Sequence, residues 1–262
     1  MREIRLRRKW ENGEPAVGCW LTLPSSFSAE VLAHAGFDWL CVDLQHGLID
    51  YAQMVGMLQA MSSQDATPLV RVPWNEPGII GKCLDAGAAG VIVPMVNSRE
   101  EAEAAVRACR YAPVGARSYG PLRARYSAGS DYFANANSTI CCIVMVETAQ
   151  AVDDVDSIVS VPGVDAVYVG PADLSLTLGL QPGPDNPDES FTSAIGRILE
   201  ACSCHGVVPG IAGNSTTAPK RIAQGFLMVE AASDSGLLVA GAAGVLGEVR
   251  PGTDTTAQAP YL

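Results

Sequence analysis

Short apolar runs alternate with longer amphipathic segments along this chain, roughly once every thirty residues, and this alternation is what most limits its fold. The apolar runs predict eight buried strands, at 17–23, 38–43, 67–72, 90–95, 141–147, 165–170, 206–211 and 226–230. Segments with helical spacing or helix-forming composition follow them, at 28–35, 51–61, 77–86, 99–109, 151–159, 190–204, 217–224 and 236–246. Eight βα units predict an α/β fold of the closed (β/α)8 TIM-barrel type. An open doubly wound sheet is the weaker alternative, because no Gly-x-Gly-x-x-Gly follows the first strand.

The chain length suits one barrel. Its 262 residues are within the range of an undivided α/β barrel, so we predict a single domain over residues 1–262. The last residues, 250–262, have the composition of a poorly ordered tail.

The composition narrows the class of partner. A formal net charge of -11 and a pI near 4.6 argue against nucleic acid or an anionic membrane as the main partner. An acidic small-molecule substrate stays compatible with this charge if arginine or a metal binds it locally. No uncharged apolar run approaches the ~20 residues of a membrane helix, and the basic N-terminus lacks the apolar core of a signal peptide. The eight cysteines mostly lie in apolar runs without Cys-x-x-Cys spacing. These observations predict a cytoplasmic protein with reduced cysteines.

Two neighbouring strands end in carboxylates. Glu147 closes Ile-Val-Met-Val-Glu, and Asp173 follows Val-Tyr-Val-Gly-Pro-Ala. Because the carboxyl ends of parallel strands meet at one edge of a sheet, both side chains are expected to converge there. Hard divalent cations are commonly held by one or two carboxylates together with waters and substrate oxygens. Glu147 and Asp173 are therefore the predicted metal ligands, although each taken singly could instead cap the segment after it.

The second and third strands end in further polar residues. Asp43 and His46 close the second strand, where they could serve as an orienting carboxylate and a general base, or simply as a cap and a loop histidine. Arg71 ends the third strand and is costly to bury without an anion. It could form a structural ion pair with Asp43 or Glu147, or hold a substrate oxygen beside the metal.

Other motifs carry less information. Gly170 allows the backbone to approach a ligand closely, or only makes a tight turn. The tract Cys202-Ser-Cys-His205 resembles a metal site, but its helical periodicity favours core packing. Residues 111–139 form a long connection, a type of segment that is often functional when it lies at the active face of a barrel.

Six ordered motifs resemble one enzyme family over residues 16–246. They are Gly36-Phe-Asp-Trp-Leu-Cys-Val-Asp-Leu-Gln-His46, Pro68-Leu-Val-Arg-Val-Pro-Trp-Asn75, Leu84-Asp-Ala-Gly-Ala-Ala-Gly-Val-Ile-Val-Pro-Met95, Met145-Val-Glu-Thr148, Val169-Gly-Pro-Ala-Asp-Leu-Ser175 and Ser233-Asp-Ser-Gly-Leu-Leu238. The chain is similar in these motifs to the class II, metal-dependent pyruvate aldolases of the HpcH/HpaI family. That family acts on 4-hydroxy-2-oxoheptanedioate and 2-dehydro-3-deoxyglucarate.

The resemblance implies a (β/α)8 barrel that assembles as a hexamer, a trimer of dimers, with a C-terminal helix exchanged between subunits. It also implies Mg²⁺, Mn²⁺ or Co²⁺ at Glu147 and Asp173. For other residues, the resemblance implies that Arg71 stabilises the enolate and that Asp43 orders a metal-bound water. It also implies that His46 is the acid/base catalyst and that Asp85 of a neighbouring subunit pairs with His46. The segment Gly170, Pro171, Ala172 and Asp173 would bind the pyruvate carboxylate through its backbone amides.

The activity implied is a carbon–carbon lyase that reversibly splits a 4-hydroxy-2-oxo acid into pyruvate and an aldehyde through a metal-stabilised enolate. Met145, Ala232 and segment 115–124 depart from some family members, and they leave the aldehyde open. One alternative uses the same enolate to decarboxylate an oxaloacetate-like acid or to cleave an acyl-CoA. An alternative of another class is a barrel that binds a 2-oxo acid without turnover.

Overall fold

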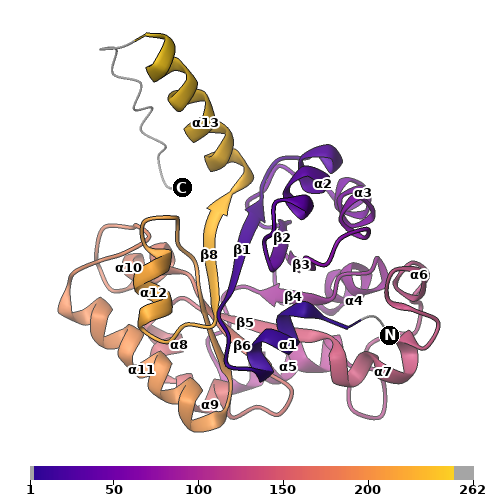
Figure 1. The fold of residues 1–262 in the computed structure, drawn as a ribbon. Coiled ribbons are helices and arrows are strands. Elements are labelled where there is room, and N and C mark those ends of the chain that lie inside the picture. The colour runs from indigo at the N-terminus through magenta and orange to yellow at the C-terminus, as the bar shows by residue number, and fades with distance from the viewer. Residues whose placement is uncertain (1–2, 251–262) are drawn as a thin grey trace.

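The computed structural model describes residues 3–250, and eight parallel strands within them close into a barrel with the order β1 to β8 (Figure 1). The strands are β1 (Ala16–Leu21), β2 (Trp39–Asp43), β3 (Thr67–Arg71), β4 (Gly90–Val93), β5 (Cys141–Val146), β6 (Ala166–Val169), β7 (Val208–Ile211) and β8 (Met228–Ser233). Each strand pairs with the next, and β1 pairs with β8. The predicted (β/α)8 barrel is confirmed, and the open sheet is excluded.

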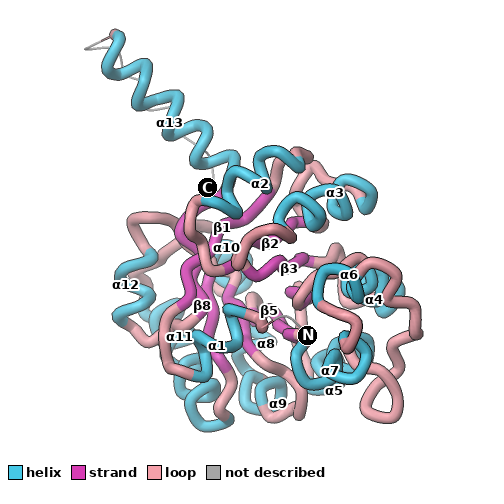
Figure 2. The backbone as a smooth tube through the Cα atoms, turned by 45° about the vertical axis from the view of Figure 1, so that its right-hand side comes forward, coloured by secondary structure: helices cyan, strands magenta, loops and turns pink. Residues whose placement is uncertain are grey.

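Helices surround the barrel (Figures 1 and 2). They are α1 (Arg5–Glu11), α2 (Ser26–His34), α3 (Tyr51–Met61), α4 (Pro77–Asp85), α5 (Arg99–Cys109), α6 (Ala124–Ala128), α7 (Tyr132–Thr139), α8 (Ala149–Asp153), α9 (Val155–Val159), α10 (Pro171–Thr177), α11 (Glu189–His205), α12 (Ala218–Ala223) and α13 (Asp234–Val249). The helix predicted at 151–159 is divided at Asp154 into α8 and α9. Helices α1, α6, α7 and α10 were not predicted, because all four are short and lack an extended amphipathic pattern.

Side chains fill the inside of the barrel. The inner cluster consists of Leu6, Trp10, Ala16, Trp20, Trp39, Cys41, Leu69, Ile92, Cys141, Ile143, Met145, Ala166, Tyr168 and Met228. Gly18 makes room for the Trp39 ring, because a Cβ at position 18 would lie 2.0 Å from it. The helices bury a separate apolar layer on the outside of the strands. This double burial explains why the strands read as continuous apolar runs.

Helix α1 closes the amino-terminal end of the barrel. The Leu6 side chain is fully buried in the inner cluster, and its backbone amide donates to Oγ1 of Thr67, at the start of β3, over 3.1 Å. Arg7 pairs with Asp165 at 2.7 Å, and Lys9 pairs with Asp38 at 3.0 Å. The basic N-terminus thus seals this end of the barrel, bound to the first residue of β3 and to the residues just before β2 and β6.

The connection over residues 111–139 lies at this same end. It leads from α5 into β5, so it belongs to the face opposite the carboxyl ends of the strands, and it contains α6 and α7. The expectation that this segment borders the active face of its own barrel is therefore wrong. The predicted helix at 99–109 and the predicted strand at 141–147 already made this segment an αβ connection, so its length alone was a misleading signal.

Helix α13 extends away from the barrel in both views (Figures 1 and 2). Ser233 caps it, and the carboxylate of Asp234 accepts the backbone amides of Thr22 and Leu23 at 2.9 and 3.0 Å, which fixes its first turn to the end of β1. Asp234 is the only residue of α13 that is buried. Arg250 ends the described part of the chain, and the rest of the tail predicted at 250–262 lies outside it.

Candidate active site

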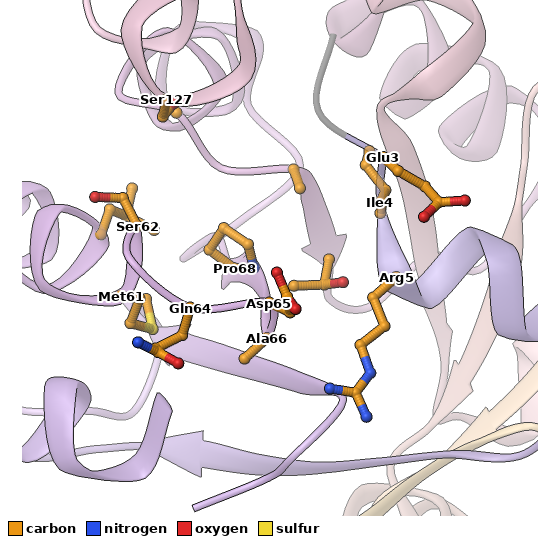
Figure 3. A pocket seen from close by; sticks show the side chains of 14 residues that line it. Glu3, Ile4, Arg5, Met61, Ser62, Gln64, Asp65, Ala66, Pro68 and Ser127 are labelled. Carbon is orange, nitrogen blue, oxygen red and sulfur yellow. The ribbon is translucent and has the colours of Figure 1, made fainter. Parts of the chain in front are cut away.

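The carboxyl ends of the strands enclose a cavity of about 510 Å³. Its lining includes most of the residues predicted for the site, which are Asp43, His46, Arg71, Glu147, Gly170, Pro171, Ala172 and Asp173. A second cavity, of about 60 Å³, lies at the amino-terminal end between Ile4 and Arg5 and the segment that joins α3 to β3 (Figure 3). None of the predicted site residues lines it. The lining places the candidate site at the carboxyl ends, because a larger cavity of about 660 Å³, lined by residues such as Pro77 of α4 and Glu100 of α5, contains none of the predicted site residues either.

Arg71 and Asp43 form a bidentate ion pair across the top of β2 and β3. The Arg71 Nε donates to Oδ1 of Asp43 at 2.8 Å, and Nη2 donates to Oδ2 at 2.6 Å. The Asp43 Oδ1 also accepts the amides of Gln45 and His46, so the turn after β2 supports the pair. Within residues 3–250 the Nη1 of Arg71 has no hydrogen-bond partner, and it remains available to a ligand in the cavity. The predicted ion pair between Arg71 and Asp43 is therefore confirmed, and the binding of a substrate oxygen by Arg71 stays a prediction.

Aromatic rings support the guanidinium from below. The Arg71 Cζ lies 4.5 Å from the centre of the Trp20 ring, and the Trp20 Nε1 donates to the Tyr168 hydroxyl at 3.0 Å. Tyr168 meets Trp20 and Trp39 edge to face. Such stacking restricts the orientation of a planar cation. The sequence analysis did not identify Trp20 or Tyr168 as site residues, because aromatic residues in an apolar strand read as core.

Glu147 is held between two backbone segments. Its Oε1 accepts the amide of Met95 at 2.8 Å, and Met95 has a left-handed backbone with φ of 55° that directs this amide toward the carboxylate. On the other side, a Cβ at Gly170 would lie 2.3 Å from Oε2. Burial, together with repulsion from Asp173, raises the pKa of Glu147 to about 7. Glycine at position 170 is thus required by close packing against this carboxylate.

Asp173 lies in the first turn of α10, facing the same cavity as Glu147. A cation between the two carboxylates would offset both the burial of Glu147 and its repulsion from Asp173, so this pair fits a hard divalent ion. No group of three or more His, Cys, Asp or Glu residues suited to a metal occurs within residues 3–250. A cation at this pair would therefore depend on water or substrate oxygens for its remaining ligands.

The backbone around Asp173 has free donors. The first helical amides of α10 have no partner inside the helix, and those of Ala172 and Asp173 border the cavity. Pro171 has no amide hydrogen, so it can contribute only its rigid backbone to the predicted carboxylate site. The segment from Gly170 to Asp173 is thus placed as expected, with two of its amides suited to an anion.

His46 lies at the mouth of the cavity and is exposed. No hydrogen bond to its imidazole occurs in the described part of the chain; only its backbone amide is held, by Asp43 at 3.3 Å. The structure thus brings His46 to the site without orienting its ring.

Asp85 is remote from this cavity within its own chain. It ends α4 and precedes β4, which places it at the amino-terminal end of the barrel, where it pairs with Arg117 at 2.7 Å. The Arg117 side chain is fully buried, donates to the Tyr132 hydroxyl and stacks on Tyr111. A single chain therefore does not bring Asp85 to His46.

Glu230 in β8 is a site residue that the sequence analysis missed. It lines the same cavity, and its Oε2 accepts the amide of Gly213 at 3.2 Å. A single charged residue at the end of the apolar run 226–230 was the available signal, the same signal that identified Glu147.

The remaining motifs from the sequence, the tract 202–205 and the connection 111–139, have structural roles. Cys202 is buried in α11 while Cys204 and His205 are at or near its surface, which favours helix packing over a metal tract. All eight cysteines are free thiols. Within the long connection 111–139, Arg123 donates to the carbonyls of Ala86 and Leu58, which ties α6 to α4 and α3. Over residues 3–250, no helix combines the length and apolar character needed to cross a membrane.

Comparison with known proteins gives consistent matches. A family model described as HpcH/HpaI aldolase/citrate lyase matches residues 16–240. The hydroxypyruvate/pyruvate aldolase of Rhizorhabdus wittichii is 41% identical over 247 residues, covering 94% of this chain and 98% of that protein. The 4-hydroxy-2-oxo-heptane-1,7-dioate aldolase of Klebsiella pneumoniae is 41% identical over 236 residues, covering 88% of each. A crystal structure of an HpcH/HpaI aldolase/citrate lyase family protein from Burkholderia cenocepacia superposes with a TM-score of 0.88 at 34% identity, covering 95% of this chain and 100% of that one.

Proposed function

Because the chain belongs to the HpcH/HpaI aldolase/citrate lyase family, we propose that it is a divalent-metal-dependent aldolase that reversibly cleaves a 4-hydroxy-2-oxo acid to pyruvate and an aldehyde. The family and the class of carbon–carbon lyase predicted from the sequence motifs are confirmed by the relatives. The observation that carries the proposed reaction is the shared cavity, in which the Arg71–Asp43 pair lies together with Glu147 and Asp173.

Glu147 and Asp173 would hold the cation, which is Mg²⁺, Mn²⁺ or Co²⁺ in this proposal. When bound, it supplies positive charge next to the carboxylate and the 2-oxo oxygen of the substrate. Support comes from two carboxylates in one cavity, and from Gly170, whose missing side chain leaves the space that the Glu147 carboxylate occupies.

The chain's own residues would perform the remaining tasks. The amides of Ala172 and Asp173 hold the substrate carboxylate, and the Nη1 of Arg71 donates to the 2-oxo oxygen, where negative charge develops as the enolate forms. Asp43 keeps the guanidinium in place through its two hydrogen bonds. His46, at the mouth, accepts the proton of the 4-hydroxyl during cleavage and returns it during condensation.

A second subunit completes this site in our proposal. Asp85 lies at the opposite end of its own barrel, and its side chain is 26% exposed, so it is available to the His46 of a neighbouring subunit. Helix α13 exposes Leu238, Val245 and Val249, an apolar surface suited to exchange between subunits. The hexamer, a trimer of dimers, is the assembly proposed on this basis, in a cytoplasmic setting.

The experiment that tests the reaction is exchange of the methyl protons of pyruvate in D₂O, followed by NMR. We expect exchange with Mg²⁺ or Mn²⁺, none after addition of EDTA, and loss of exchange in Arg71→Ala. Exchange that persists in EDTA would contradict a metal-dependent enolate. Absence of exchange although pyruvate binds would instead favour the non-catalytic 2-oxo-acid binder.

The decarboxylase and the acyl-CoA lyase would form the same enolate, so assays with different substrates distinguish them from the aldolase. Release of carbon dioxide from oxaloacetate faster than aldol cleavage would indicate a decarboxylase, and cleavage of an acyl-CoA would indicate a thioester lyase. The family description includes citrate lyase, so both assays belong beside the aldehyde screen.

A further inference from the structure

Glu230 introduces a carboxyl group into one wall of the cavity. It lies in β8, level with Gly18 of β1 in the strand register. Its Oε2 accepts the Gly213 amide at 3.2 Å, which directs the side chain toward the carboxyl ends of the strands, and it lines the cavity together with Arg71. The proposed reaction uses Arg71, Glu147 and Asp173 but gives Glu230 no task.

The surroundings of Glu230 combine apolar and charged groups. Trp20 of β1, Ala212 after β7 and the Tyr168 ring line the same cavity, and the charges of Arg71 and Asp43 both act on the carboxyl group. A carboxyl group in such a wall is costly unless it has partners. Its Oε2 accepts the Gly213 amide, and the Tyr168 hydroxyl is a second hydrogen-bond partner of the carboxyl group. The side chain is partly exposed to the cavity, so a ligand can reach it.

The position of a bound 2-oxo acid follows from the proposed function. Glu147 follows β5, Asp173 follows β6 and Arg71 ends β3, so the carboxylate and the 2-oxo oxygen would face that half of the ring. In a closed barrel of eight strands, β8 and β1 lie opposite β4 and β5. The C3 carbon, which points away from both oxygens, would therefore face β7, β8 and β1, where Glu230 lies.

We infer that Glu230 is a specificity-determining residue that hydrogen-bonds a hydroxyl group on C3 of the donor, so that the site favours a 3-hydroxy-2-oxo acid such as hydroxypyruvate over pyruvate. This inference rests on the proposed function, because the direction of C3 depends on how the 2-oxo acid is bound. A hydroxyl is the group that suits this wall, since it is small, neutral and able to donate and accept.

The protonation of Glu230 supports such a contact. Burial, together with the charge of Asp43, raises its pKa to about 8 against the opposing effects of the Gly213 amide and of Arg71. Near neutral pH the carboxyl group is therefore present in a protonated form that donates and an ionised form that only accepts. A neutral carboxyl also avoids repelling the acid substrate that Arg71 would bind.

The test compares pyruvate and hydroxypyruvate in the intact protein with Mn²⁺, using C3-proton exchange in D₂O and binding calorimetry. We expect Glu230→Ala to lower the ratio of kcat/KM for hydroxypyruvate to that for pyruvate by about tenfold to a hundredfold, with a matching loss in the ratio of affinities. Glu230→Gln keeps the shape and the hydrogen-bonding capacity, so its ratio should stay within about threefold of the wild-type value. Glu200→Gln, at an exposed position of α11, is the matched control and should retain the wild-type ratio.

The possible results distinguish a failure of the role assigned to Glu230 from a failure of the proposed aldolase function. Equal losses for both donors in Glu230→Ala, or an unchanged ratio in that variant, would overturn the role of Glu230 while leaving the aldolase reaction in place. Absence of exchange with either donor in the wild type would overturn the proposed function and this inference with it. If Glu230→Ala does not fold, a Glu230→Gln ratio more than about tenfold below that of the wild type would overturn the hydrogen-bond assignment, because that variant keeps both donor and acceptor.

Discussion

Glu147 and Asp173 face one cavity, and their mutual repulsion contributes to the raised pKa of Glu147. We expect Glu147→Gln and Asp173→Asn each to lower the affinity for Mn²⁺ by about two orders of magnitude, because each removes one of two anionic ligands. Calorimetric titration with Mn²⁺ measures this directly. Asp153→Asn, at an exposed carboxylate of α8, is the control and should bind Mn²⁺ as the wild type does. Wild-type affinity in either site variant would show that the cation binds elsewhere.

The raised pKa of Glu230 predicts how stability depends on pH. Its carboxyl group has an ordinary pKa of 4.5 and a pKa of about 8 in the folded protein, so the unfolded chain binds fewer protons between these values. The free energy of unfolding contributed by this group therefore falls as pH rises from 4.5 to 8. Since Gln does not titrate, Glu230→Gln should gain about 2 kcal/mol relative to the wild type over this range.

Urea unfolding with EDTA present, at pH 5 and at pH 8, measures that difference. The estimate of 2 kcal/mol is well below the full value of the pKa shift, because the cavity admits solvent. A wild-type protein that instead became more stable than Glu230→Gln at the higher pH would contradict the raised pKa.

Helix α1 acts as a structural element at the closed end of the barrel. Leu6 is fully buried there, so Leu6→Ala should lower the free energy of unfolding by about 2–5 kcal/mol through lost burial and the cavity that remains. Leu176→Ala, at an exposed position of α10, should cost less than about 0.5 kcal/mol. Denaturant unfolding compares the two. Similar effects in both variants would mean that α1 does not seal the barrel.

Helix α13 contributes little to the core of its own chain. Its side chains at Leu238 and Val245 are 67% and 62% exposed, so we expect charge at these positions to disturb association and to leave the barrel folded. The double variant Leu238→Glu with Val245→Glu should show a lower mass by light scattering, with little change in circular dichroism. Glu248→Gln on the same helix is the control and should keep the wild-type mass. An unchanged mass in the double variant would argue against an interface through α13.

Active sites shared between two subunits should also be detectable by activity measurements on mixed oligomers. If Asp85 serves the His46 of a neighbouring subunit, His46→Ala and Asp85→Ala would each be inactive alone, while mixed oligomers would contain some sites with both residues intact. Co-expression of the two variants should therefore restore about a quarter of the wild-type exchange rate or less, as expected for an isologous arrangement of shared sites. No recovery in verified mixed oligomers would place Asp85 outside the site.

Much of the molecule was predictable because its strands are buried on both sides. Such strands appear as continuous apolar runs, so all eight were found, and a polar residue at the end of a run, such as Glu147 or Arg71, stood out against them. Residues that contribute to the site through an aromatic ring or a backbone amide gave no such signal. Trp20 and Tyr168 look like core in the sequence, and the left-handed conformation of Met95 that directs its amide to Glu147 is invisible there.

The sequence by itself determined the barrel, the family and the carboxylates at the ends of two strands, because these depend on local periodicity and on residue type. Only the tertiary structure decided which groups meet. It paired Arg71 with Asp43, brought Glu230 into the same cavity and placed residues 111–139, with the buried partner of Asp85, at the opposite end. The physical reason is that closing eight strands into a ring brings β8 back beside β1, a contact between segments some two hundred residues apart that no local pattern encodes.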